Sequence, residues 1–282
     1  MKKIEKLKLL IQKPLVLINS GLNVQKEEYY HSRNRNKYGI EQLPTIDICE
    51  LFPGFSESIN NYTYLDGTSL AIDIMLLKSL ARSFKNCAYL EIGSWRGESI
   101  SNIYEVTGDC TSVTLSGDEM KGKGMNDEYI RAHGMFSKNL KALKSIEHNS
   151  LTFDFSSLNK KFDLIFIDGD HSYEGVLNDT IKTLPLRRDN NSIIVWHDYG
   201  NSTEMVRHSV LAAILDGIPG EYHRNLYHVS NTLCAVYIEN KTFNTYYTKF
   251  PTTPDKIFTI KLTSEKISDL NLRNMDFVNQ SL

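Results

Sequence analysis

The chain has 282 residues, of which 41% are hydrophobic and 23% are charged, and its formal net charge is −2. This length holds one large domain or a core domain with appendages, and the composition is that of a globular protein. The nearly balanced charge argues against a protein held on nucleic acid by many lysines and arginines. We therefore expect no nucleic-acid partner.

The four cysteines are widely spaced and form no CxxC motif, so we expect neither a zinc cluster nor a disulfide framework. They fit small buried residues in a reducing compartment. Lysines precede apolar residues at the N-terminus, but the longest apolar run there covers only residues 15–18, too short for a signal peptide. No stretch of about 20 apolar residues could cross a membrane. We expect a cytoplasmic protein, with a basic helix on a membrane surface as the alternative.

Residues 1–65 combine a lysine-rich helical start with a polar stretch rich in tyrosine and arginine. This composition predicts an N-terminal helical arm or lid. Such an arm could support a homodimer, or it could pack on the core of its own chain.

Residues 66–240 alternate short apolar runs with amphipathic segments. We expect strands within residues 88–92, 111–120, 150–155, 162–168 and 191–200, and helices within residues 66–84, 125–144, 173–184 and 204–216. Thr68 and Ser69 are the expected N-cap candidates for the first helix. Apolar strands alternating with amphipathic helices predict a Rossmann-like, doubly wound α/β fold, with a mostly parallel sheet between two helical layers.

Residues 221–240 read as two strands separated by a short turn near Ser230 and Asn231. The connection is too short for a parallel crossover, so the pair should be antiparallel. A C-terminal antiparallel pair, together with the missing GxGxxG fingerprint, argues against an NAD-linked oxidoreductase on a similar sheet. Residues 241–282 are polar and irregular, and we treat them as a C-terminal extension.

The segment "LEIGSWRGES", residues 90–99, follows the first strand of this pattern. Gly93 and Gly97 bracket a tight turn into a helix, where backbone can approach a ligand closely. Glu91 lies near the end of a buried strand, where an acid is costly unless it meets a cation or a hydrogen-bond donor. The amino group and sulfonium of S-adenosylmethionine would supply positive charge there. The alternative is a strand–helix turn with a partly exposed glutamate.

The chain resembles the class I S-adenosylmethionine-dependent methyltransferases. It looks most like the branch that methylates sugars and other small molecules, which includes macrocin-type sugar O-methyltransferases and cephalosporin-pathway relatives. The resemblance covers roughly residues 66–240 and rests on "EIGSWRGES", "FDLIFIDGDHSYEGVLNDT" and "IIVWHDYG", in this order. Many methyltransferases share the first motif, whereas the second and third together are more specific.

The resemblance implies which residues contact the cofactor. Glu91, Gly93, Ser94 and Gly97 would line its methionine end. The acid that follows the second strand, Asp118 or Glu119, would bind the ribose hydroxyls. Ser150 and Asp154 are candidates near the adenine, although either could be a turn residue.

Two acidic strand ends are the other candidate site. Asp168 follows one apolar run, and His197 with Asp198 follows another. Ligands gather at the carboxyl ends of strands in an open parallel sheet, so neighbouring strands would aim both motifs at one cleft. Asp168, His197 and Asp198 could then hold Mg²⁺ or another divalent ion. In the metal-dependent O-methyltransferases that the chain resembles, an acid is usual at the position of His197, which points to a softer ion than Mg²⁺ or to no metal.

Asp168, Asp170 and His171 are the catalytic candidates. Asp168 would position the acceptor, and Asp170 or His171 would be the general base, histidine having the more suitable pKa of about 6.5. Alternatively, Asp170 or Ser172 simply caps the next helix. We expect a methyltransferase that O-methylates a small hydroxyl compound such as a sugar or glycan precursor. A non-catalytic methyltransferase-like binding protein is an alternative. The nearly balanced charge and the lack of an Asn-Pro-Pro-aromatic motif argue against a nucleic-acid methyltransferase.

Overall fold

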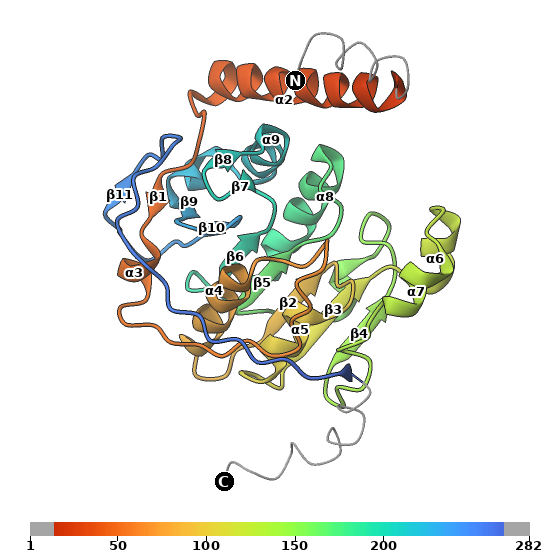
Figure 1. The fold of residues 1–282 in the computed structure, drawn as a ribbon. Coiled ribbons are helices and arrows are strands. Elements are labelled where there is room, and N and C mark those ends of the chain that lie inside the picture. Colours follow the sequence, from red (N-terminus) through yellow and green to blue (C-terminus); the bar gives the residue numbers. More distant parts are fainter. Residues whose placement is uncertain (1–13, 268–282) are drawn as a thin grey trace. The chain divides into compact units, whose positions relative to one another are not determined.

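The computed structural model describes residues 14–267. One compact unit extends to Phe250 and a second begins at Pro251. The first unit carries the sheet and the helices around it (Figure 1). The ends of the predicted arm and of the predicted C-terminal extension, residues 1–13 and 268–282, lie outside the described residues.

A mixed sheet has the strand order β11-β1-β9-β10-β6-β5-β2-β3-β4 (Figure 1). Its parallel part consists of β4 (Lys144–Glu147), β3 (Cys110–Thr114), β2 (Tyr89–Ile92), β5 (Leu164–Ile167) and β6 (Ile193–Trp196). An antiparallel pair completes it next to β6, formed by β10 (Ala235–Tyr237) and β9 (Leu226–Val229). The predicted fold, including the antiparallel C-terminal pair, is confirmed.

Strand residues alternate between two apolar cores, one on each face of the sheet. Leu90 and Ile92 share a core with residues of α8 (Tyr173–Thr183) and α9 (His208–Gly217). Tyr89 packs in the other core, with residues of α4 (Ala71–Arg82) and α5 (Glu98–Tyr104). Helices therefore cover both faces, and the three-layer arrangement is confirmed.

The predicted strand at residues 150–155 is wrong. The strand that follows β3 along the chain is β4, and residues 150–155 form a turn that leads into the 3₁₀ helix η1 (Phe155–Leu158). β4 lies at the sheet edge and is largely exposed, so it carries no apolar pattern. Phe153, in a loop, and Phe155, at the start of η1, pack on the core instead. Their hydrophobic side chains give this segment a composition typical of a strand.

Three other predicted elements are shorter than expected. The helix predicted over residues 125–144 covers only α7 (Asp127–Ala132). The strand predicted over residues 111–120 ends at Thr114, because Ser116 and Glu119 form a capping box that starts α6 (Gly117–Gly122). The helix predicted from residue 204 begins at His208, since β8 (Met205–Val206) pairs with β7 (Gly200–Ser202).

The N-cap of α4 is Leu70, so neither predicted cap residue caps this helix. The hydroxyl of Thr68 instead donates to Glu98 at 2.9 Å, and that of Ser69 lies 3.4 Å from Asp168. Thr68 therefore contacts the first turn of α5, and Ser69 contacts the residue that follows β5, rather than the amides of α4.

Residues on both sides of residues 66–240 also contribute strands to the sheet. β1 (Thr45–Ile46) runs parallel to β9, and β11 (Thr245–Tyr246) pairs with β1 in the antiparallel sense. The remaining short elements are α3 (Ile48–Leu51), η2 (Leu184–Leu186) and η3 (Gly220–Asn225). Between residues 14 and 267, no helix is long and apolar enough to cross a membrane.

The long helix α2 (Pro14–Tyr38) packs on α9. Asp216 of α9 accepts hydrogen bonds from Arg33 at 2.5 Å, from Lys37 at 2.6 Å and from the Tyr38 hydroxyl. Tyr173 of α8 donates to the same carboxylate at 2.7 Å. Burial alone would raise the pKa of Asp216, but these donors hold it well below its usual value.

Asp216→Asn should lower the free energy of unfolding by about 1–3 kcal/mol at pH 7, because a charge-assisted acceptor for several donors is lost. The depressed pKa means that this contribution is present above pH ~4, where the unfolded carboxyl ionises, and is lost as the pH falls further. The difference between wild type and variant in urea unfolding should therefore shrink with acidification. Glu128→Gln, which removes an exposed pair with Arg131, should change stability by less than about 0.5 kcal/mol. Equal effects of the two substitutions would contradict this account.

Candidate active site

The register of β5 and β6 brings the two acidic strand ends together. The strands run parallel with Ile167 opposite Trp196, and the amide of His197 donates to the carbonyl of Ile167 at 3.0 Å. Asp168 and His197 are the next residues along each strand, so they emerge side by side at the carboxyl edge of the sheet.

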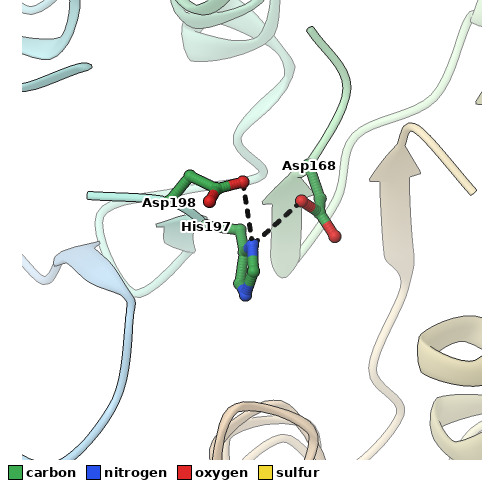
Figure 2. A group of neighbouring side chains, drawn as sticks. All are labelled: Asp168, His197 and Asp198. Atoms are coloured by element: carbon green, nitrogen blue, oxygen red, sulfur yellow. Dashed lines mark hydrogen bonds and ion pairs between the residues drawn. The ribbon is translucent and has the colours of Figure 1, made fainter. Parts of the chain in front are cut away.

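Figure 2 shows that three side chains converge at this edge, Asp168, His197 and Asp198. The Nδ1 atom of His197 lies 3.1 Å from Oδ1 of Asp168 and 3.2 Å from Oδ2 of Asp198. Asp198 has a φ of +58°, in the left-handed region that side chains other than glycine rarely adopt. This conformation accompanies a strained backbone at a cluster of ionisable groups, a combination common at functional sites.

The three residues offer one nitrogen and two oxygen ligand atoms, all within 4.8 Å of one another. A facial set on an octahedral ion with bonds of about 2.1 Å has ligand atoms about 3 Å apart. The two distances from Nδ1 are close to this value, as they are to hydrogen bonds from a protonated Nδ1, and the two carboxylate oxygens lie within 4.8 Å of each other. The residues present therefore fit a divalent cation with mixed nitrogen and oxygen ligands.

Opposite charges dominate the electrostatics of the cluster. Burial opposes a charge on His197, yet Asp168, Asp198 and Asp73 raise the pKa of His197 well above its usual value. Burial would likewise raise the pKa of Asp198, but its contacts with His171 and His197 hold that pKa well below the usual range.

The two candidate bases differ in what they contact. Nδ1 of His171 lies 2.7 Å from Oδ2 of Asp198, which joins His171 to the cluster. Asp170 is exposed, and its carboxylate accepts from the amide of Ser172 at 2.8 Å. Ser172 itself caps α8 by accepting from Gly175. Asp198 also pairs with Arg207, whose Nη2 lies 3.1 Å from Oδ1.

The glycine loop, residues 93–97 between β2 and α5, lies beside this cluster. Gly93 has a φ of +84°, and a Cβ there would stand 2.1 Å from the carbonyl oxygen of Asp168. Gly97 has a φ of +86° and is the N-cap of α5, and a Cβ there would meet Ser137. Ser94 between them is buried. Gly93 is thus required by its close approach to the backbone of Asp168, the residue that follows β5.

Glu91 is fully buried at the end of β2. Its carboxyl accepts hydrogen bonds from the Tyr89 hydroxyl at 2.7 Å and from the Ser99 hydroxyl at 2.8 Å. Burial raises the pKa of Glu91 to about 7, although these hydroxyls act in the opposite direction. Glu91 therefore has hydrogen-bond donors within the protein itself, and its pKa still lies near neutrality.

The strand order changes direction at this place. From β2 the chain passes to β3 and β4 on one side, and later to β5 and β6 on the other. Ligands of open α/β sheets bind outside the carboxyl ends of the strands at such a switch point. Gly93 and Asp168 flank it, so the glycine loop and the acidic cluster share one edge.

The residues predicted to contact the ribose and the adenine follow β3 and β4, not β2 or β5. Asp118 is exposed in the first turn of α6. Glu119 is engaged by the capping box with Ser116 and accepts from the amide of Asn149 at 3.0 Å. The carbonyl of Ser150 accepts from Asn178 and Lys182, and Asp154 caps η1. Glu119, Asp154 and the carbonyl of Ser150 each make a local structural contact. Asp118 takes part in none of the described hydrogen bonds.

Residues 63–69 border the site, although the sequence pattern did not indicate them. Glu98 accepts from the amide of Thr63 at 2.8 Å and from the hydroxyl of Thr68 at 2.9 Å. A buried ion pair between Arg96 and Glu98, 3.1 Å long, holds the other side of this segment. Ser69 then reaches Asp168 at 3.4 Å. The segment is therefore tied both to the glycine loop and to the acidic cluster.

Asp73 is a further residue that sequence reasoning missed. It comes from α4, is fully buried, and lies 3.1 Å from Nε2 of His197. An acid inside the apolar run "AIDIMLL" was the available signal, because a charge there needs a buried partner.

Residues 90–199 match the family model described as a methyltransferase domain. The chain contains an S-adenosylmethionine-dependent methyltransferase domain. The matched range includes both the glycine loop and the acidic cluster. A curated relative, the uncharacterised protein R132 of Acanthamoeba polyphaga mimivirus, is 29% identical over 122 residues, which are 40% of this chain. The match spans about half of that relative, 53% of its length.

Solved structures similar to this chain include three O-methyltransferases. A protein from Staphylococcus aureus described as a caffeoyl-CoA O-methyltransferase has 17% identity and a TM-score of 0.44, covering 61% of this chain and 85% of its own. An O-methyltransferase from Bacillus cereus has 16% identity and a TM-score of 0.41, covering 62% and 84%. A TDP-rhamnose 3'-O-methyltransferase of calicheamicin biosynthesis has 13% identity and a TM-score of 0.42, covering 60% and 78%. At these scores the likeness adds nothing to the fold, which the strand order already gives.

Gly93→Ala should destabilise the methyltransferase domain and disturb its site, because the new Cβ would collide with the backbone of Asp168 at a positive φ. We expect a loss of at least about 1–3 kcal/mol in urea unfolding. Gly108→Ala is a matched control, since a Cβ there meets nothing within 4 Å. If both variants unfolded at the same urea concentration as wild type, the close packing of the glycine loop against Asp168 would be refuted.

Proposed function

We propose that this methyltransferase transfers the methyl group to a hydroxyl of a small polar acceptor, such as a sugar or glycan precursor. The observation that carries the proposal is the convergence of Asp168, His197 and Asp198 at the strand edge that also holds the glycine loop. Oxygen and nitrogen atoms there can orient an acceptor hydroxyl at the switch point of the sheet.

The reaction is an in-line displacement at the methyl carbon. A bond forms from the acceptor oxygen to this carbon as the carbon–sulfur bond breaks, and the electron pair remains on sulfur. The hydroxyl proton must leave, so the protein has to position the oxygen and accept a proton. A divalent ion held by Asp168, His197 and Asp198 would lower the pKa of a bound hydroxyl.

We assign the proton acceptor to His171 rather than to Asp170. His171 reaches the cluster through Asp198 at 2.7 Å, and this hydrogen bond raises the pKa of His171. Its side chain is also 52% exposed, so a proton could pass on to solvent. Asp170 is already used by the turn before α8. Asp168, beside Ser69, is the residue that positions the acceptor.

We place the methionine end of S-adenosylmethionine at the glycine loop, with Glu91, Gly93, Ser94 and Gly97. Glu91 supports this placement because it is a buried acid close to the strand end and needs a cationic neighbour to ionise fully. Asp118 for the ribose and Ser150 near the adenine remain part of the same proposal.

Asp168→Ala should abolish methyl transfer and leave cofactor binding largely intact. Turnover is followed as release of S-adenosylhomocysteine with a panel of free and nucleotide-linked sugars, and binding by calorimetry with S-adenosylhomocysteine, with NAD as the negative control. Asp189→Ala, in an exposed turn before β6, should behave as wild type. Unchanged turnover in the Asp168 variant would refute the site assignment, and binding of NAD instead would refute the cofactor.

S-adenosylmethionine should bind more tightly above pH 7 than at pH 6. The pKa of Glu91 is about 7, so the carboxyl is largely protonated at pH 6 and must lose its proton beside the cationic cofactor. Affinity should rise by at most about tenfold per pH unit below this pKa. Calorimetry at pH 6 in two buffers of different ionisation enthalpy should detect proton release.

Glu91→Gln should remove this proton release, whereas Glu128→Gln at an exposed position should leave it unchanged. Identical proton release in the Glu91 variant and in wild type would show that another group titrates on binding.

A further inference from the structure

Asp73 connects three parts of the fold that are distant in sequence. Its Oδ2 accepts from the amide of Leu70 at 2.9 Å, at the start of α4. Its Oδ1 accepts from the amide of Leu233 at 2.9 Å, in the turn between β9 and β10. Oδ2 also lies 3.1 Å from Nε2 of His197, which follows β6. The side chain has no exposed surface, so water does not replace any of these partners.

This contact fixes the orientation of His197. An ionised carboxylate only accepts hydrogen bonds, so the Nε2 atom of His197 must carry a proton and donate to Asp73. The other ring nitrogen, Nδ1, consequently faces Asp168 and Asp198. A flipped ring would present a carbon atom to Asp73 and leave a buried carboxylate oxygen without this donor, which is costly. The side chain of His197 is only 9% exposed, so it has little room to turn elsewhere.

A nitrogen among the ligands changes which ion fits. Mg²⁺ prefers an all-oxygen environment, whereas imidazole suits Zn²⁺, Ni²⁺ and iron, and affinities of mixed sites rise from Mn²⁺ to Co²⁺. A carboxylate on the far nitrogen of a ligating histidine also sets its tautomer and strengthens it as a ligand.

We propose that Asp73 is a positioning residue that holds Nδ1 of His197 toward Asp168 and Asp198, and that this arrangement makes the site select a transition-metal dication over Mg²⁺. This inference rests on the metal site in the proposed function. It adds the class of ion and the residue that determines the selection.

Asp73 could instead serve only to accept the amide of Leu70, the N-cap of α4, and the two roles predict different results. A cap contributes to stability alone, since its contact with Leu70 is independent of any ion. A positioning residue changes the ratio of affinities for Co²⁺ and Mg²⁺ in protein that remains folded. That ratio is therefore the decisive measurement.

The experiment measures Co²⁺ binding to the full chain by visible absorption, and Mg²⁺ binding by competition with Co²⁺. Asp73→Asn should weaken Co²⁺ binding by about 10–100-fold and Mg²⁺ binding by less, so that the ratio falls. Asp163→Asn is the matched control, because Asp163 is also a buried acceptor of a backbone amide, that of Ala88, and precedes β5 at its opposite end. This control should keep the wild-type ratio.

A second variant keeps the test decisive if Asp73→Asn unfolds. His197→Asp replaces the nitrogen ligand by oxygen and should shift the preference toward Mg²⁺. A wild-type ratio of Co²⁺ to Mg²⁺ affinity in either folded variant would overturn the inference. Wild-type protein that binds S-adenosylhomocysteine but neither ion would overturn the metal site together with this inference, while leaving the methyltransferase assignment in place.

Discussion

The parallel register of β5 and β6 is the constraint on which the rest of the site depends. Ile167 lies opposite Trp196, so both strands end at one level and deliver Asp168 and His197 to the same edge. A shift of one residue would turn these side chains to opposite faces of the sheet. The register in turn depends on the two cores, which bury alternate residues of each strand. Apolar packing of the strands thus determines where the polar side chains of the candidate site lie.

Charges that would be unfavourable singly are tolerated here because each meets an opposite charge or a donor. Asp198 faces His171, His197 and Arg207, and Asp73 takes donors from three different elements. Removing one member leaves its partners buried without compensation, which costs more than the net value of the pair. The cluster is therefore cooperative, and its members should be interpreted as one unit.

The alternation of apolar runs and amphipathic segments was sufficient to predict the sheet, its helical layers and the antiparallel end pair. The prediction failed at two places where hydrophobic sequence and strand structure do not coincide. β4 is a strand, but it is exposed at the sheet edge. Phe153 and Phe155 pack on the core but lie outside any strand. The convergence of Asp168, His197 and Asp198 was predictable because Asp168 directly follows one apolar strand and His197, with Asp198 after it, directly follows another. Asp73 was not, because its role depends on a helix 124 positions from His197 along the chain.

The packing of α2 on α9 also affects residues at the start of α9. Glu27 accepts from the amides of His208 and Ser209, so it supplies the cap that the first turn of α9 lacks in its own sequence. Arg207, the residue just before this turn, pairs with Asp198. The start of α9 therefore contacts both the N-terminal helix α2 and the candidate site. A chain shortened past residue 38 would lose this cap, and the pair between Arg207 and Asp198 would lose the support that α2 gives it from outside the candidate site.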